Sequence, residues 1–96
     1  MNPTKVRRNN LNQLTDLPNV GPSIAADLVL IGVRSPEDLV ARDPYQMYRE
    51  LSVATMSYQD PCVLDTFISI TRFMAGDDPK PWWKYTAERK RTIQSN

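Results

Sequence analysis

Four prolines, each directly after a small or acidic residue, divide this chain into short segments. The pairs are Gly21-Pro22, Ser35-Pro36, Asp43-Pro44 and Asp60-Pro61. Proline is favoured at the first position of an α-helix, where its missing N–H costs no hydrogen bond, and small polar residues are favoured as helix caps. The pairs therefore predict four helix starts and limit the fold to an assembly of short helices.

The segments after these pairs carry apolar residues at helical spacing. We expect helices over 22–31, 36–42 and 61–75, one that begins at Asp43-Pro44, and a short one over 10–16. Gly32 and Gly76 each follow an expected helix, as is typical of a helix C-terminus. Because no alternating strand pattern or hairpin signal is present, we expect an all-α fold of five helices.

The length of 96 residues, 41% of them hydrophobic, fits one small domain with little room for an enclosed active site. We divide the chain into a basic N-terminal tail over 1–9, a helical domain over 10–79 and an aromatic, basic C-terminal extension over 80–96. Neither a membrane-spanning run nor a secretory signal is present, so we expect a cytoplasmic location without membrane contact.

The chain contains no histidine and one cysteine, Cys62. This excludes histidine-dependent catalysis and a thiolate zinc site within one chain. A position near a helix start would favour the Cys62 thiolate through the helix dipole, but a small core residue is the simpler interpretation. We therefore expect no catalytic residue, no metal centre formed by side chains and no cofactor, and we do not expect an enzyme.

Charge is distributed unevenly although the net charge is only +1. Residues 9–79 hold four arginines and ten acidic residues, so this middle part is net −6. The two ends are basic, with three cations in 1–8 and five in 80–96. Such ends are either solvated surface or contacts for an anionic polymer.

The stretch LPNVGPSIAADLVLIG, residues 17–32, places a tight turn directly before a helix. The first N–H groups of a helix lack internal partners, and glycine at position 21 allows a phosphate to approach the backbone. Asparagine tolerates left-handed backbone at position 19. The turn therefore predicts a phosphate site formed by Asn19, Val20, Gly21, Ser23 and Ile24, unless it serves only to pack helices. The nearest charges, Asp16 and Asp27, are both acidic, so cations must come from the chain ends.

The C-terminal extension contains the run Trp82-Trp83-Lys84-Tyr85. Interleaved aromatic and basic residues can stack on bases, but paired tryptophans also form a hydrophobic clasp. We expect Trp82 to pack on the helices and Trp83 or Lys84 to lie at the surface. The candidate nucleic-acid contacts in the extension are Lys84, Arg89, Lys90 and Arg91.

The pattern L-P-x-V-G-P-x-x-A-x-x-L, followed by G-V and SPEDL, resembles the helix-hairpin-helix motif. The resemblance implies binding of the DNA backbone without sequence preference, with hairpin N–H groups on a phosphate. It also implies a monovalent cation held by hairpin carbonyls, here those of Pro18 and Val20. The chain departs from the motif at Asn19, where glycine is usual, and it lacks a lysine or arginine after Gly21. The second expected hairpin, TMSYQDP, has no glycine.

Over residues 11–85, this stretch followed by DPYQMYREL, DPCVLDTF and WW resembles the bacterial "pathogenicity locus" family, whose members are sometimes labelled mitomycin-resistance-like. The resemblance implies a double helix-hairpin-helix domain of the SAM-like kind, with a tryptophan-containing C-terminal extension. We expect weak, non-sequence-specific DNA binding linked to the DNA damage response or repair. The alternative is a protein-interaction adaptor that does not bind nucleic acid, in which the first hairpin and the tryptophan cluster form the interface of a complex such as a homodimer.

Overall fold

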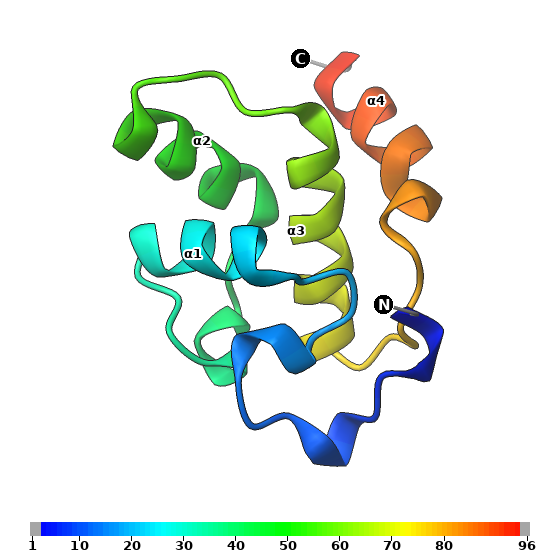
Figure 1. Cartoon of the computed structure of the whole chain (residues 1–96). Coiled ribbons are helices and arrows are strands. Elements are labelled where there is room, and N and C mark those ends of the chain that lie inside the picture. Colours follow the sequence, from blue (N-terminus) through cyan, green and yellow to red (C-terminus); the bar gives the residue numbers. More distant parts are fainter. Residues whose placement is uncertain (1–2, 95–96) are drawn as a thin grey trace.

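The computed structural model describes residues 3–94, which fold into helices joined by turns, without a β-strand in this part of the chain. The α-helices are α1 (Pro22–Leu30), α2 (Pro44–Thr55), α3 (Pro61–Met74) and α4 (Thr86–Gln94). The expected all-α fold is confirmed (Figure 1). Within residues 3–94, no helix has the length and hydropathy needed to cross a membrane.

The expected number of five α-helices in the helical domain is wrong. The segments expected to be helical over 10–16 and 36–42 are single 3-10 turns, Leu14–Asp16 and Pro36–Leu39. Leu11 and Gln13 are extended, so only the last three residues of the segment 10–16 are helical, and Val40 is extended, so the turn Pro36–Leu39 does not continue. Further 3-10 turns are Pro3–Lys5, Arg8–Asn10 and Trp82–Tyr85, and the fourth α-helix, α4, lies in the extension.

Helix α3 lies at the centre of the molecule. Its residues 64–70 are all buried, and it contacts α2, α4 and the turns Pro36–Leu39 and Trp82–Tyr85. Helices α1 and α2 lie on one side of α3, and α4 lies on the other (Figure 1). A helix buried on all sides requires apolar residues around its whole circumference, and residues 64–70 of α3 meet this requirement except at Asp65, Thr66 and Ser69.

The C-terminal extension is part of the folded domain. Tyr85 is buried and packs with Leu64 and Ile68 of α3, on the side away from the main core. The main core joins α1, α2 and α3 around residues such as Leu28, Leu51 and Phe67. Since removal of Tyr85 would expose one side of α3, the extension completes the burial of the central helix.

The described part of the predicted basic tail also packs on α3. The Arg8 guanidinium donates hydrogen bonds to the carbonyl oxygens of Phe73 and, at 2.7 Å, of Asp77. It also lies over the Phe73 ring, 4.1 Å from the centroid. A cation at a helix C-terminus interacts favourably with the helix dipole, so Arg8 stabilises the end of α3. Residues 1–2 and 95–96, the outer ends of the two predicted tails, lie outside the described residues.

Candidate nucleic-acid interface

Residues 17–21, here called the first turn, reverse the chain before α1. Leu17 and Val20 are fully buried, and the Val20 N–H donates to the Leu17 carbonyl at 3.4 Å. Asn19 adopts left-handed backbone with φ of 66°, as its identity predicted. Two buried apolar residues thus anchor the turn while Asn19 supplies the reversal.

The N-terminus of α1 is open. No side chain caps it. The first backbone hydrogen bond of the helix runs from the Ala25 N–H to the Gly21 carbonyl, at 3.0 Å. The N–H groups of Gly21, Ser23 and Ile24 find no acceptor among the described residues. A Cβ placed on Gly21 would meet nothing within 4 Å. The first turn therefore offers three adjacent donors, an unopposed helix dipole and space for an anion.

Residues 56–60, here called the second turn, precede α3. The N-terminus of α3 is capped by a side chain. The Asp60 carboxylate accepts a hydrogen bond from the Cys62 N–H at 2.9 Å and caps α3. This hydrogen bond lowers the pKa of Asp60 below its ordinary value. Because a carboxylate already occupies this helix start, a second anion would be repelled from it.

The side chain of Asn19 fastens the extension to the first turn. Its amide nitrogen donates to Ser69 Oγ at 2.9 Å and to the Lys80 carbonyl at 2.8 Å, and its oxygen accepts from the Trp82 N–H at 3.2 Å. Asn19 therefore contributes backbone shape to the candidate site, while its side chain holds residues 80–82 beside the turn.

This contact places the backbone of an exposed lysine, Lys80, beside the turn, a residue that was not among the predicted contacts. Trp82 is half-buried and meets Trp83 edge to face, with ring centroids 5.7 Å apart. Trp83 is 57% exposed, so the expectation that Trp82 packs while Trp83 reaches the surface is confirmed. An asparagine where the motif has glycine was the one local signal for this contact.

Arg89 has a structural partner. Its Nε donates to the fully buried carboxylate of Asp65 at 2.8 Å, and Thr86 Oγ1 donates to the same group at 2.7 Å. The bond to Asp65 raises the pKa of Arg89. Arg89 was predicted as a nucleic-acid contact, but in the structure its guanidinium joins α4 to α3 and is not a free surface cation.

The other predicted cations of the extension are exposed: Lys84 lies in the turn Trp82–Tyr85, and Lys90 and Arg91 lie on α4. Helix α4 leads away from the first turn (Figure 1). The structure thus places the backbone of Lys80 beside the first turn and Lys84 two residues after Trp82, but it does not gather Lys90 and Arg91 there.

Cys62 is half-buried at the start of α3. Burial raises the pKa of its thiol, and the hydrogen bond and negative charge of Asp60 raise it further. Burial, with Asp60, therefore favours the thiol form of Cys62, opposite to the effect expected from the helix dipole.

Side-chain groups of three or more that suit a metal ion are absent from the described residues. The carbonyl oxygens of Pro18 and Val20 accept no hydrogen bond from this part of the chain. The Asn19 carbonyl between them accepts none either, so three successive carbonyl groups of the first turn remain open.

The fold and the first turn define a small all-helical protein with an open helix start. Residues 7–91 match the model of the family described as "Pathogenicity locus". The chain is 42% identical over 82 residues to "Mitomycin resistance protein McrB" of Streptomyces lavendulae, a match that spans 85% of this chain and 78% of the relative. The chain belongs to the pathogenicity locus family, and the resemblance predicted from its motifs is confirmed. No solved structure matches it significantly.

Proposed function

We propose that the protein binds the phosphate backbone of nucleic acid, weakly and without sequence preference, at the first turn. The observation that carries the proposal is the uncapped N-terminus of α1, where the N–H groups of Gly21, Ser23 and Ile24 point to no protein acceptor. Backbone donors at a helix start bind phosphate by geometry and dipole and read no base sequence.

In this proposal the domain is a double helix-hairpin-helix, with the first and second turns as its two hairpins. Helices α1 and α3 both begin at a proline, Pro22 and Pro61, 39 positions apart, which supports two related units. The 3-10 turns Leu14–Asp16 and Pro36–Leu39 take the places of the remaining short helices. The Pro18 and Val20 carbonyls are available to hold a monovalent cation between the turn and a phosphate.

Affinity must come mainly from the extension, because the middle of the chain is acidic. Lys80 lies beside the turn and Lys84 follows closely, whereas Arg89 is paired with Asp65. Each cation that neutralises a phosphate releases a counterion, so binding must weaken steeply with salt. A site with so few cations is expected to have a Kd of about 10⁻⁴ M at physiological salt, at the weak end of non-specific binding.

The name of the Streptomyces relative supports a setting for this activity. That protein is named for resistance to mitomycin and is similar to this chain over most of its length. We propose that this chain also acts in the response to DNA damage or its repair, where sequence-independent backbone binding suits lesions in any sequence.

Fluorescence anisotropy with labelled single- and double-stranded DNA at low salt tests the proposal. Gly21→Ala places a methyl group in the open space at the turn without steric conflict, so folding is preserved and phosphate approach is blocked. We expect Gly21→Ala and Lys80→Ala each to weaken binding several-fold, and the matched change Ser57→Ala in the second turn to leave it unchanged. Absence of saturable binding, or equal binding by all variants, would contradict the proposal.

The second candidate function is an adaptor in which the first turn and the neighbouring Trp83 contact a protein. The exposure of Trp83 beside the turn favours it, since aromatic residues dominate protein interfaces. Light scattering after size exclusion distinguishes a homodimer from a monomer. Loss of a dimer on Trp83→Ala, together with no DNA binding by the wild type, would favour the adaptor.

A further inference from the structure

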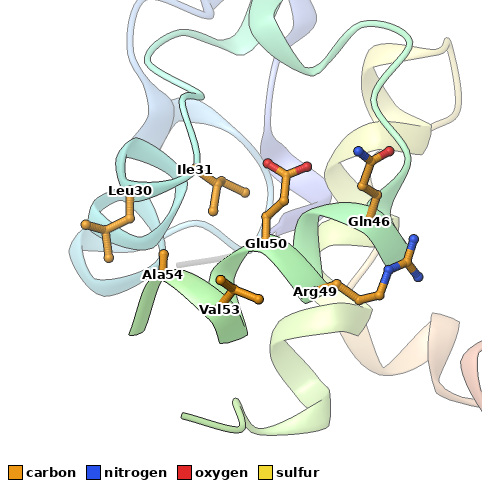
Figure 2. Close-up of a pocket in the computed structure, with 7 residues that line it drawn as sticks. All are labelled: Leu30, Ile31, Gln46, Arg49, Glu50, Val53 and Ala54. Carbon is orange, nitrogen blue, oxygen red and sulfur yellow. The ribbon is translucent and has the colours of Figure 1, made fainter. Parts of the chain in front are cut away.

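A groove between α1 and α2 lies at the end of α1 that is distant from the first turn. It has a volume of about 570 Å³ and is lined by Leu30, Ile31, Gln46, Arg49, Glu50, Val53 and Ala54 (Figure 2). We call it the α1–α2 groove. The first turn enters α1 at Pro22, whereas Leu30 is the last residue of this helix, so the groove and the proposed phosphate site occupy opposite ends (Figure 1).

Apolar side chains at the groove are unusually exposed. Leu30 is 58% exposed on α1, and Val53 is 77% exposed on α2. A second hollow of about 460 Å³ adjoins it, sharing Arg49 and Val53 and continuing past Met56 and Tyr58. Met56 and Tyr58 are more than nine-tenths exposed. The two hollows form one continuous apolar strip, and strips of this kind mark interaction surfaces.

The charges beside this strip do not cancel. Glu50 is paired with Arg42, whose guanidinium nitrogen lies 3.1 Å from the carboxylate. Arg49 is exposed and forms no hydrogen bond or ion pair with any described residue. The groove therefore presents apolar side chains together with one positive charge that lacks a partner.

We propose that the α1–α2 groove binds an amphipathic helix of another protein, with apolar side chains between Leu30 and Val53 and a carboxylate on Arg49. A hollow bordered by two helices matches the helix-in-groove mode, in which anchors at i, i+3 or i+4 and i+7 enter one apolar trough. An acidic residue beside these anchors satisfies the uncompensated charge of Arg49 and fixes the orientation of the helix.

Two other occupants fit less well. Nucleic acid requires several cations along its backbone, and Arg49 is the one lysine or arginine that lines the two hollows. A second copy of this chain would have to supply a free carboxylate from the same face, where the lining acid Glu50 is already paired with Arg42. An acidic amphipathic helix satisfies both the apolar and the charged parts of the groove.

A display library of helical peptides tests the proposal with a probe of defined chemistry. Peptides of about 15 residues, randomised on one face, are selected on the wild-type protein and in parallel on Val53→Asp and Arg49→Glu. Both variants change exposed side chains, so the folded state is preserved, and circular dichroism confirms it. Lys90→Glu on α4 is the matched charge control.

The wild type and Lys90→Glu are expected to select apolar residues at i, i+3 or i+4 and i+7 with an aspartate or glutamate beside them. Selection should be lost on Val53→Asp, and Arg49→Glu should replace the selected acids with lysine or arginine. No enrichment over Val53→Asp, or no acidic preference on the wild type, overturns the proposal. Loss of a dimer or of oligonucleotide binding on Val53→Asp would instead assign the groove to a second copy or to nucleic acid. Gly21 does not line the groove, so Gly21→Ala should select the same peptides as the wild type. A failure of peptide selection therefore says nothing about phosphate binding at the first turn.

Discussion

The first and second turns have the same local plan and opposite properties. Each reverses the chain with a left-handed residue, Asn19 or Met56, and each leads into a helix that begins with proline. The first turn leaves its helix start uncapped and binds residues 80–82 of the extension through Asn19, whereas the second is capped by Asp60 and projects into solvent. One residue before the proline, glycine or aspartate, decides whether the helix dipole is available to an external anion.

The difference also shows how a site acquires its charge. The first turn contains no cation, but Asn19 binds the backbone of Lys80 and so attaches a lysine residue beside the turn. Within residues 3–94, no hydrogen bond of this kind joins the second turn to residues 80–82, and the carboxylate of Asp60 occupies its helix start.

The largest effect is expected from Arg89→Ala. This change leaves the fully buried Asp65 carboxylate without its ionic partner, and we expect the free energy of unfolding to fall by about 3 kcal/mol. Urea denaturation measures it. Lys90→Ala, on the exposed side of α4, is the control and should change stability by less than about 0.5 kcal/mol. Equal stability of the two variants would show that the extension is not held by this ion pair.

Asn19→Ala is expected to destabilise the protein by about 2 kcal/mol, because it removes the hydrogen bonds to Ser69, Lys80 and Trp82 and strains the left-handed backbone. Asn19→Gly relieves the backbone strain alone and should lose less. A change in the fluorescence of Trp82 and Trp83 should accompany both variants as the extension loosens. Unaltered fluorescence would contradict the role of Asn19 as the fastening residue.

Met56→Gly in the second turn is expected to act in the opposite direction. Met56 has left-handed backbone with φ of 51°, and its side chain is exposed, so glycine removes strain without loss of packing. We expect stabilisation by about 1 kcal/mol, measured by thermal or urea unfolding. Destabilisation by this change would show that the Met56 side chain has packing partners and that the second turn is held by side-chain contacts as the first turn is.

The smallest effect concerns the reactivity of Cys62. Burial and Asp60 raise the pKa of this thiol, so near neutral pH it should react with iodoacetamide more slowly than free cysteine, with a rate that rises as pH approaches the raised pKa. Asp60→Asn keeps a capping side chain but removes the negative charge, so the pKa falls and alkylation at a fixed pH accelerates. Asp43→Asn, at the corresponding cap of α2, is the control. No acceleration on Asp60→Asn would show that the carboxylate does not control the thiol.

The local elements of this fold could be predicted from the sequence. Each cap-proline pair begins a helical segment at the predicted residue, and the helix expected over 61–75 is observed as Pro61–Met74. The lengths of the segments after Asn10 and Ser35 were overestimated, because Leu11 and Gln13 are extended at the beginning of the first segment and Val40 is extended at the end of the second. The cap-proline pairs thus fixed where helices begin, whereas the segment without such a pair was wrong at its beginning.

The candidate site was predicted less completely, because its decisive contacts join distant parts of the chain. Asn19 binds Lys80 and Trp82, and Asp65 binds Arg89, and no local pattern connects these residues. Polar residues at positions 65 and 69 of a helix that is otherwise apolar at its centre were the available signal. Asp65 pairs with Arg89 and accounts for the partial burial of that arginine. The charge pattern alone had predicted Arg89 to be a nucleic-acid contact.

The central claim is that an anion binds at the start of α1 and not at the start of α3. A titration followed by ¹⁵N–¹H correlation NMR, with a short DNA duplex and separately with inorganic phosphate at low salt, compares the two helix starts in one experiment. The account predicts saturable shifts of the amide signals of Gly21, Ser23 and Ile24, while those of Cys62 and Val63 stay in place. Shifts of equal size at both helix starts, or none at the first turn, would contradict it.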